Sequence, residues 1–198
     1  HEGIEVIKAN AFSCEFPASE MILPASLKLI KESNFTGTNV NVIKAKNRTP
    51  KGILKTILIS STPYNGNYVD NNIVTLIINE GGQDYTFYIP RYLNSPQVVE
   101  LDDFFSSFSP KYMEKSKMDS LYKHCLTNAV SHDTALELYK LTARDCFKEA
   151  LKPSRQSIVK RYFENGDEER LILFFKLGFF AKSSLEKFLK KAQEIDMI

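Results

Sequence analysis

The strongest constraint on the fold is an internal repeat near the start of the chain. Residues 4–13 (IEVIKANAFS) correspond to residues 27–36 (LKLIKESNFT), so apolar, lysine, phenylalanine and hydroxyl positions recur at an offset of 23 residues. A period of about 20–50 residues is typical of proteins built from stacked repeats. One such unit cannot cover its own apolar side chains, so neighbouring units bury them by stacking. We therefore expect Phe12 and Phe35 to be buried and stacked on one another.

Each copy of the repeat is followed by a polar linker and a β-like run, residues 21–24 and residues 40–43. This arrangement resembles the BspA-like class of leucine-rich repeats, in which an Ala-Phe pair precedes a linker and an Ile-x-Leu-Pro-x-Ser-Leu pattern. The matching residues are Ile7, Ala11, Phe12, Ile22, Leu23, Pro24, Ser26, Leu27 and Ile30. The resemblance implies a binding module, and it names no ligand. Two repeats are fewer than the roughly three that a solenoid needs, so either the next segment of the chain caps these two or they end a longer array.

The segment after the repeats predicts a small antiparallel sheet. Residues 53–59 alternate imperfectly and favour a strand. Residues 73–78 are apolar and largely β-branched, residues 80–83 supply a turn, and residues 85–89 form an aromatic strand that ends at Pro90. We expect this sheet to continue the sheet of the repeats and to shield its open end, because uncovered edges invite aggregation.

Residues 94–110 indicate a boundary, because Pro96 and Pro110 bracket a serine-rich stretch. Within it, three phenylalanines are spaced for one helical turn: Phe104, Phe105 and Phe108. If they pack back on the sheet they are core residues, and if they are exposed they mark a partner site. The predicted domains are therefore residues 1–93, with repeats and sheet, a linker over 94–110, and a helical domain over 111–198.

The helical domain is predicted from apolar residues at helical spacing and from capping signals. Asp133 can cap a helix from residue 134 that ends near 151, Asn165-Gly166 can close the next helix, and Asp167 can open another. Ser183 and Glu186 form a capping box before the last helix. Residues 164–195 resemble an ankyrin-type hairpin, although the T-P-L-H signature is absent. The predicted fold class is thus α+β: a short leucine-rich-repeat-like β segment and a small antiparallel sheet, followed by an all-α helical-hairpin domain.

Composition excludes several classes of partner. The net charge of +2 is spread along the chain, whereas a nucleic-acid-binding domain shows a basic stripe or a high isoelectric point. No apolar run approaches the roughly 20 residues of a membrane-spanning helix. Three widely spaced cysteines argue against a disulfide framework and favour a reducing compartment such as the cytoplasm. We expect no cofactor, and we expect another protein as the partner.

Enzyme signatures are absent, and one cluster keeps a catalytic alternative open. The alternative is a metal-dependent or cysteine-based enzyme that uses His124, Cys125, His132 and Cys146. On one helix the two histidines would lie about 12 Å apart along the axis, whereas zinc requires ligand nitrogens within about 2.1 Å. A helix break near Ser131 would still allow a shared site. The main hypothesis remains a protein-protein interaction module without catalysis.

The resemblance to leucine-rich repeats also predicts the binding surface, because the outward side chains of the strands are available to a ligand. Strands centred on residues 21–23 and 40–42 place Glu20 and Asn41 outward, and the set extends to Lys44 and Lys55. The opposing interpretation is that these four residues are merely solvated and that the partner docks on the helical half.

Overall fold

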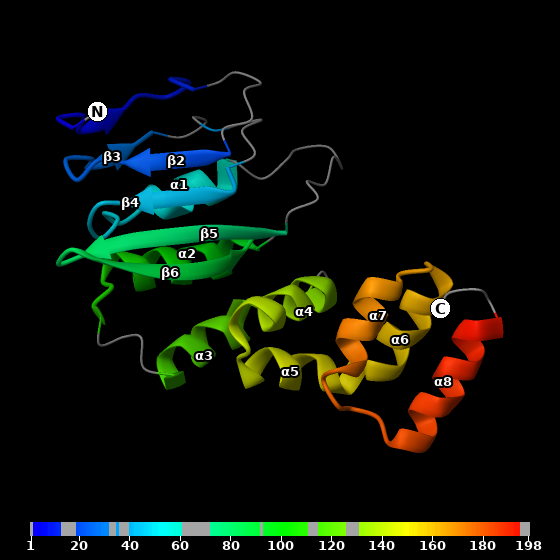
Figure 1. Cartoon of the computed structure of the whole chain (residues 1–198). Helices are drawn as coiled ribbons and strands as arrows, with labels where there is room; N and C mark the ends of the chain where they lie inside the picture. Colours follow the sequence, from blue (N-terminus) through cyan, green and yellow to red (C-terminus); the bar gives the residue numbers. More distant parts are fainter. Residues whose placement is uncertain are drawn as a thin grey trace. The chain divides into compact units, whose positions relative to one another are not determined.

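The computed structural model describes residues 2–12, 19–31, 35, 40–60, 72–91, 93–110, 115–125 and 131–194. These residues form a mixed α+β fold with two small sheets. The chain divides into two compact units, His1–Cys125 and Leu126–Ile198 (Figure 1). Both sheets belong to the first unit, and the described part of the second unit is helical.

The two copies of the repeat lie side by side in the first unit. β1 (Val6–Ile7) pairs in parallel with β3 (Leu29–Ile30), and β2 (Glu20–Leu23) pairs in parallel with β4 (Val42–Ala45). Val6 lies opposite Leu29, so the register of the first pair equals the offset of the sequence repeat. The hydroxyl group of Ser26 also accepts from the Gly3 N–H at 3.0 Å and donates to the Ile4 carbonyl at 2.9 Å.

The phenylalanines of the two copies stack as predicted, but only one of them is buried. The ring centroids of Phe12 and Phe35 are 5.7 Å apart and the ring planes are inclined by 15°. Phe35 is 2% exposed, whereas Phe12 is 47% exposed, so the predicted burial of Phe12 is wrong. Phe12 belongs to the first copy, and nearly half of its side chain is accessible to solvent.

The predicted hairpin continues the sheet of the repeats. β5 (Ile73–Glu80) pairs in parallel with β4 and antiparallel with β6 (Gln83–Pro90), which gives the strand order β2-β4-β5-β6. Gly81 and Gly82 form the tight turn with φ angles of 64° and 83°, values that glycine adopts without steric cost. The antiparallel hairpin and its continuity with the repeat strands are both confirmed.

Residues 53–59 were predicted as a strand, and this prediction is wrong because they lie in helix α1 (Ile53–Ser60). Ile53, Leu54, Ile57 and Leu58 are each at most 3% exposed. Their spacing puts all four on one side of a helix, whereas a strand would send them to both faces. The buried carboxylate of Asp102 accepts hydrogen bonds from the backbone N–H groups of Gly52 at 2.6 Å and Lys55 at 2.9 Å. It thereby satisfies two donors at the start of α1.

The stretch expected to be a linker, residues 94–110, contains helix α2 (Ser95–Ser106). Asn94 and Gln97 form a reciprocal capping box, and Pro96 lies in the first turn. Phe105 and Phe108 are buried against Phe87, with ring centroids 4.8 and 5.2 Å away, so these rings are core residues. The first unit therefore includes α2 and α3 (Lys115–Cys125) and extends beyond the boundary predicted at residue 93.

In Figure 1, α1 and α2 lie on the same face of the four-stranded sheet. The side chains on that face form the core of the first unit and alternate along each strand: Leu23 on β2, Ile43 and Ala45 on β4, Val74, Leu76 and Ile78 on β5, and Phe87 and Ile89 on β6. The opposite face therefore presents the intervening residues of all four strands.

The second unit consists of α4 (Ser131–Thr142), α5 (Asp145–Leu151), a 3₁₀ turn (Lys152–Ser154), α6 (Arg155–Glu164), α7 (Glu168–Phe175) and α8 (Lys182–Glu194). Ala143, with φ of 52°, separates α4 from α5, so the predicted single helix up to residue 151 is wrong. Gly166, with φ of 64°, follows α6, and the Asp167 side chain caps α7 at the Arg170 N–H, both as predicted. Since α8 begins at Lys182, Ser183 lies inside its first turn and not before it.

Candidate functional site

The face of the four-stranded sheet opposite α1 and α2 is the main candidate surface. Cross-strand register places two rows of side chains there: Glu20, Val42, Thr75 and Tyr88 in one, and Ile22, Lys44, Ile77 and Thr86 in the other. We call these eight residues the open face. They alternate with the buried residues, because successive side chains of a strand point to opposite faces.

The open face is unusually apolar for a surface in contact with solvent. Ile22 is 60% exposed, and Val42, Ile77 and Tyr88 are half-buried. A solvated face of a sheet usually carries polar residues at these positions. Contiguous exposed apolar side chains with polar neighbours are typical of surfaces that bind another protein.

Two of the four predicted binding residues, Glu20 and Lys44, lie on the open face. The Lys44 ammonium is 2.8 Å from the Glu20 carboxylate, and both side chains are more than two-fifths exposed. An exposed ion pair of this kind contributes at most about 1 kcal/mol to stability. Both groups therefore remain accessible to a ligand at little energetic cost to the fold.

The other two predicted residues, Asn41 and Lys55, lie elsewhere. The Asn41 side chain accepts a hydrogen bond from the buried Arg91 guanidinium at 2.6 Å, and the same nitrogen donates to the Val40 carbonyl at 2.9 Å. The sequence predicted a strand over residues 40–42, whereas β4 begins at Val42. Asn41 comes one residue before Val42, which belongs to the open face, and a shift of one residue in a strand exchanges faces, so Asn41 lies away from the open face. Lys55 is exposed on α1, the helix that covers the other face. The predicted outward placement of these two residues on the sheet is wrong.

The residues of the enzyme hypothesis are only partly described. Cys146 is buried in α5, whereas the side chains of His124 and Cys125 lie outside the described part of the chain. His132 lies in α4, and burial lowers the pKa of its imidazole; the nearby Arg161 acts in the same direction and Asp133 opposes it. Within the described residues, no group of three or more His, Cys, Asp or Glu side chains could hold a metal ion.

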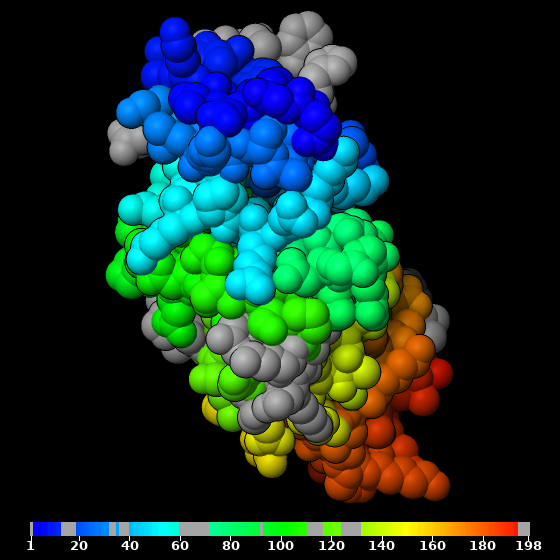
Figure 2. Space-filling view, turned by 90° about the vertical axis from the view of Figure 1, so that its left-hand side faces the viewer, coloured from blue at the N-terminus to red at the C-terminus, as the bar shows by residue number. Residues whose placement is uncertain are grey.

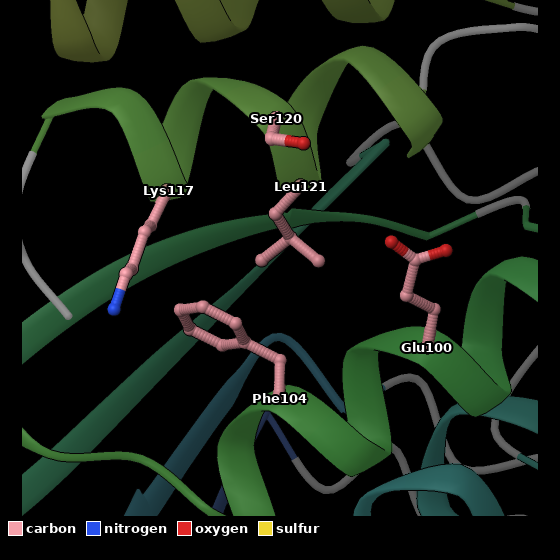
Figure 3. A pocket seen from close by; sticks show the side chains of 5 residues that line it. All are labelled: Glu100, Phe104, Lys117, Ser120 and Leu121. Carbon is pink, nitrogen blue, oxygen red and sulfur yellow. The ribbon is translucent and has the colours of Figure 1, made fainter.

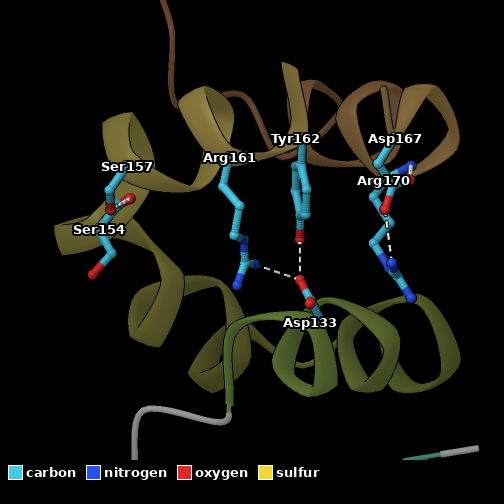
Figure 4. A network of polar contacts seen from close by, with 7 residues as sticks. All are labelled: Asp133, Ser154, Ser157, Arg161, Tyr162, Asp167 and Arg170. Carbon is cyan, nitrogen blue, oxygen red and sulfur yellow. Dashed lines mark hydrogen bonds and ion pairs between the residues drawn. The ribbon is translucent and has the colours of Figure 1, made fainter. Parts of the chain in front are cut away.

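Asp133 joins two helices of the second unit, a role that the sequence pattern did not predict. Its Oδ1 accepts from Arg161 Nη2 at 2.6 Å and from the Tyr162 hydroxyl at 2.7 Å (Figure 4). Tyr162 is 1% exposed, and burial followed by the contact with Asp133 raises the pKa of its phenol. Arg170 forms a second ion pair with Asp167, at 2.7 Å. Each carboxylate of this cluster therefore has a guanidinium or hydroxyl partner, which favours a structural role in attaching α4 to α6.

A pocket of about 310 Å³ lies in the first unit between α2 and α3. Phe104 and Leu121 point toward each other at its centre, and Glu100 and Lys117 lie on either side (Figure 3). Ser120 completes the lining. The volume is at the lower end of the range for small-molecule sites, and the lining combines an apolar centre with one acid and one base.

Comparisons with protein-family models, with curated proteins and with solved structures found no match to this chain. The described helices include none that is both long enough and apolar enough to cross a lipid bilayer. On the open face, strand register brings the exposed Ile22 to the same side of the sheet as the half-buried Val42, Ile77 and Tyr88.

Proposed function

We propose that this protein is a protein-protein interaction module that binds another protein through the open face, without catalysis and without a cofactor. One observation carries the proposal: the strongly exposed Ile22 lies on the same face of the sheet as the half-buried Val42, Ile77 and Tyr88, so that each of the four strands places an apolar side chain there. Exposure of these side chains is unfavourable in water, and a partner that covers them recovers roughly 25 cal/mol for each Å² of apolar surface.

The proposal also includes a more specific assignment of the fold, to two known classes of repeat protein. The first two copies are leucine-rich repeats of the BspA-like class, and the hairpin of α7 and α8 is ankyrin-like. The 23-residue offset and the parallel pairing of β1 with β3 and β2 with β4 support the first part. Repeat proteins of both classes present extended surfaces to other proteins, although a fold by itself does not determine a function.

Site-specific photo-crosslinking tests where the partner binds. A photoreactive amino acid replaces Thr86, an exposed residue of the open face, or Lys55, an exposed residue of α1 on the opposite side of the sheet. In lysate of the source organism, we expect Thr86 to crosslink one protein that unlabelled protein displaces, and Lys55 not to crosslink it. Equal crosslinking from both positions, or none from Thr86, would place the interaction elsewhere.

Charge reversal provides a matched pair of variants on the same two surfaces. Lys44→Glu and Lys55→Glu make the same change, but only Lys44 lies on the open face. We expect Lys44→Glu to reduce recovery of the crosslinked partner by about tenfold, as charge reversal within an interface does, and Lys55→Glu to leave it unchanged. Both variants should melt within a few degrees of the natural protein, because neither lysine is buried. Unchanged recovery with Lys44→Glu would move the site to the helical half.

The enzyme hypothesis on His124, Cys125, His132 and Cys146 remains a prediction that zinc analysis can test. Zinc that co-purifies in a one-to-one ratio with the chain, and is lost from a His132→Ala variant, would favour the enzyme over the interaction module.

A further inference from the structure

The turn between α4 and α5 is made by two residues whose side chains do not favour it. Ala143 has a φ angle of 52°, a conformation that glycine adopts without steric cost and that alanine does not. Arg144 precedes α5 at the position where Ser, Thr, Asp or Asn usually accepts a hydrogen bond from the helix, and its side chain forms no such bond. The Arg144 N–H instead donates to the Thr142 hydroxyl at 3.4 Å, which is long for a hydrogen bond. The turn therefore carries a cost in free energy that a glycine and a capping side chain would avoid.

The sequence on both sides of this turn is compatible with one continuous helix. Residues 131–151 contain neither glycine nor proline. Leu138, Thr142 and Cys146 keep a spacing of four residues across the turn, and Leu138 and Cys146 are both buried. The same pattern underlies the sequence prediction of one helix up to residue 151. A straight helix over residues 131–151 would avoid the positive φ angle and would replace the poor turn with regular backbone hydrogen bonds.

A straight helix would separate α4 from the helices that it contacts in the folded chain. α4 and α5 lie side by side (Figure 1). Asp133 of α4 binds Arg161 and Tyr162 of α6, and Lys140 of α4 lies 3.4 Å from Glu169 of α7. Each of these contacts joins a residue before the turn to a residue after it. A second copy of the chain can therefore supply all of the same partners to α4.

The helices after the turn are held to one another by aromatic contacts that do not involve α4. The rings of Tyr162 on α6 and Phe174 on α7 have centroids 6.1 Å apart. Phe188 on α8 lies 6.0 Å from Phe163 on α6 and 5.3 Å from Phe175 on α7. The orange and red segments in Figure 2 include these three helices. The group from α5 to α8 can therefore change partners as one body.

We propose that two copies of this chain exchange the helices α5 to α8. In the exchanged dimer each chain forms one helix over residues 131–151, and α4 of each copy packs against α5 to α8 of the other. Exchange of an identical element is a low-cost route to a dimer, because the contacts are those of the single chain. The dimer gains the relief of two unfavourable turns, and its population rises with concentration. The open face belongs to the other unit and takes no part in the exchange, so the dimer carries this face twice.

One substitution at the turn tests the proposal. Ala143→Gly removes the cost of the positive φ angle and weakens a helix through residue 143, so both effects favour the turn. Ala150→Gly is the matched control, because residue 150 is exposed on α5 and is helical in both arrangements. After refolding from urea at high chain concentration, sedimentation should show a dimer for the natural chain and for Ala150→Gly. The association constant of Ala143→Gly should be lower by about a hundredfold, which is about tenfold for each of the two turns.

Two results of this experiment would overturn the proposal. One is a natural chain that stays monomeric after refolding at every concentration. The other is a dimer whose association constant Ala143→Gly and Ala150→Gly change equally.

Two charge-reversed variants test whether a dimer forms by exchange. Asp133→Arg and Arg161→Asp each place like charges at the contact between α4 and α6. In an exchanged heterodimer of the two variants, each α4–α6 contact again joins one acid to one base. After the two are refolded together, native mass spectrometry should therefore show the heterodimer in excess over both homodimers. If either variant does not fold alone, its recovery by refolding with the other is the same positive result.

A statistical mixture of homodimers and heterodimers would mean that the dimer forms through another surface, and the proposal would then be wrong. If the two variants fold neither alone nor together, the comparison of Ala143→Gly with Ala150→Gly decides.

Discussion

Asp102→Ala should destabilise the first unit far more than the same change at the next residue, Asp103→Ala. Asp102 is 3% exposed, and its carboxylate accepts two backbone hydrogen bonds at the start of α1, from Gly52 and Lys55. Asp103 instead pairs with Lys51, whose side chain is 74% exposed. The two variants remove the same chemical group from adjacent positions, so the difference between them measures the contact with α1.

The magnitude follows from the two hydrogen bonds. Each bond to a charged group contributes about 1.5 kcal/mol or more, so the loss of both costs about 3 kcal/mol in the free energy of unfolding. The exposed pair of Asp103 contributes less than about 1 kcal/mol. Asp102→Asn should lie between these values, because an amide oxygen still accepts but carries no charge.

Hydrogen exchange of peptides covering residues 52–60 measures this effect where it arises, without the assumption that both units unfold together. A loss of 3 kcal/mol corresponds to an increase of roughly 150-fold in the exchange rate of the α1 amides. Protection of α1 that falls equally in Asp102→Ala and Asp103→Ala would refute the proposed capping of α1 by Asp102. Peptides from α6 serve as an internal control, because they belong to the other unit.

Three further predictions concern the two units. Phe35→Ala should lower the free energy of unfolding by about 3–5 kcal/mol, the range for an emptied aromatic core site, and Phe12→Ala should lower it clearly less because Phe12 is half-exposed. Urea melts in which Phe35→Ala loses less than about 1 kcal/mol would contradict the stacking of the repeats. Asp133→Ala should lower the free energy of unfolding by about 1–3 kcal/mol, because it leaves the buried Tyr162 hydroxyl without its acceptor. The loss should be smaller in a Tyr162→Phe background. A double-mutant cycle without coupling would show that the hydrogen bond is unimportant. The pKa of His132 is lowered in the folded state, so the unfolded chain binds more protons once the pH falls below about 6.5. Stability should therefore fall as the pH falls through this value. In melts between pH 5.5 and 7.5, a His132→Gln variant should show a smaller fall in stability.

The sequence was informative wherever a local or periodic pattern determined structure. The repeat predicted that Phe12 and Phe35 stack, and the turn and strand chemistry predicted the hairpin of β5 and β6. The caps at Gly166 and Asp167 were also predicted, since each depends on residues within one or two turns of the helix. Burial of Phe12 was not predictable from the pattern, because burial depends on which layers stand on either side.

The errors occurred where distant residues decide the local structure. The β-branched residues of 53–59 favoured a strand, and the carboxylate that supports helix α1 comes from Asp102, about 50 residues later. Asn41 was assigned to the wrong face because the start of β4 was misplaced by a short distance, and each shift of one residue exchanges faces. Asp133 was interpreted as a helix cap, yet its partners Arg161 and Tyr162 lie on another helix. Propensity and periodicity within one sequence give no signal for contacts of this range.

Two of the long-range contacts in the first unit also determine when it can fold during synthesis. The ribosome releases the repeats first, but Arg91, which binds residues 40 and 41, and Asp102, which binds the start of α1, emerge about 50 residues later. Repeats of an ordinary solenoid can fold one after another as they appear. We expect the first unit to become stable only after α2 has left the exit tunnel, because loop closure over this distance must precede the contacts that stabilise it. A stalled nascent chain whose α2 is still inside the tunnel should therefore remain sensitive to protease within residues 40–60, and a chain long enough to expose all of α2 should become resistant.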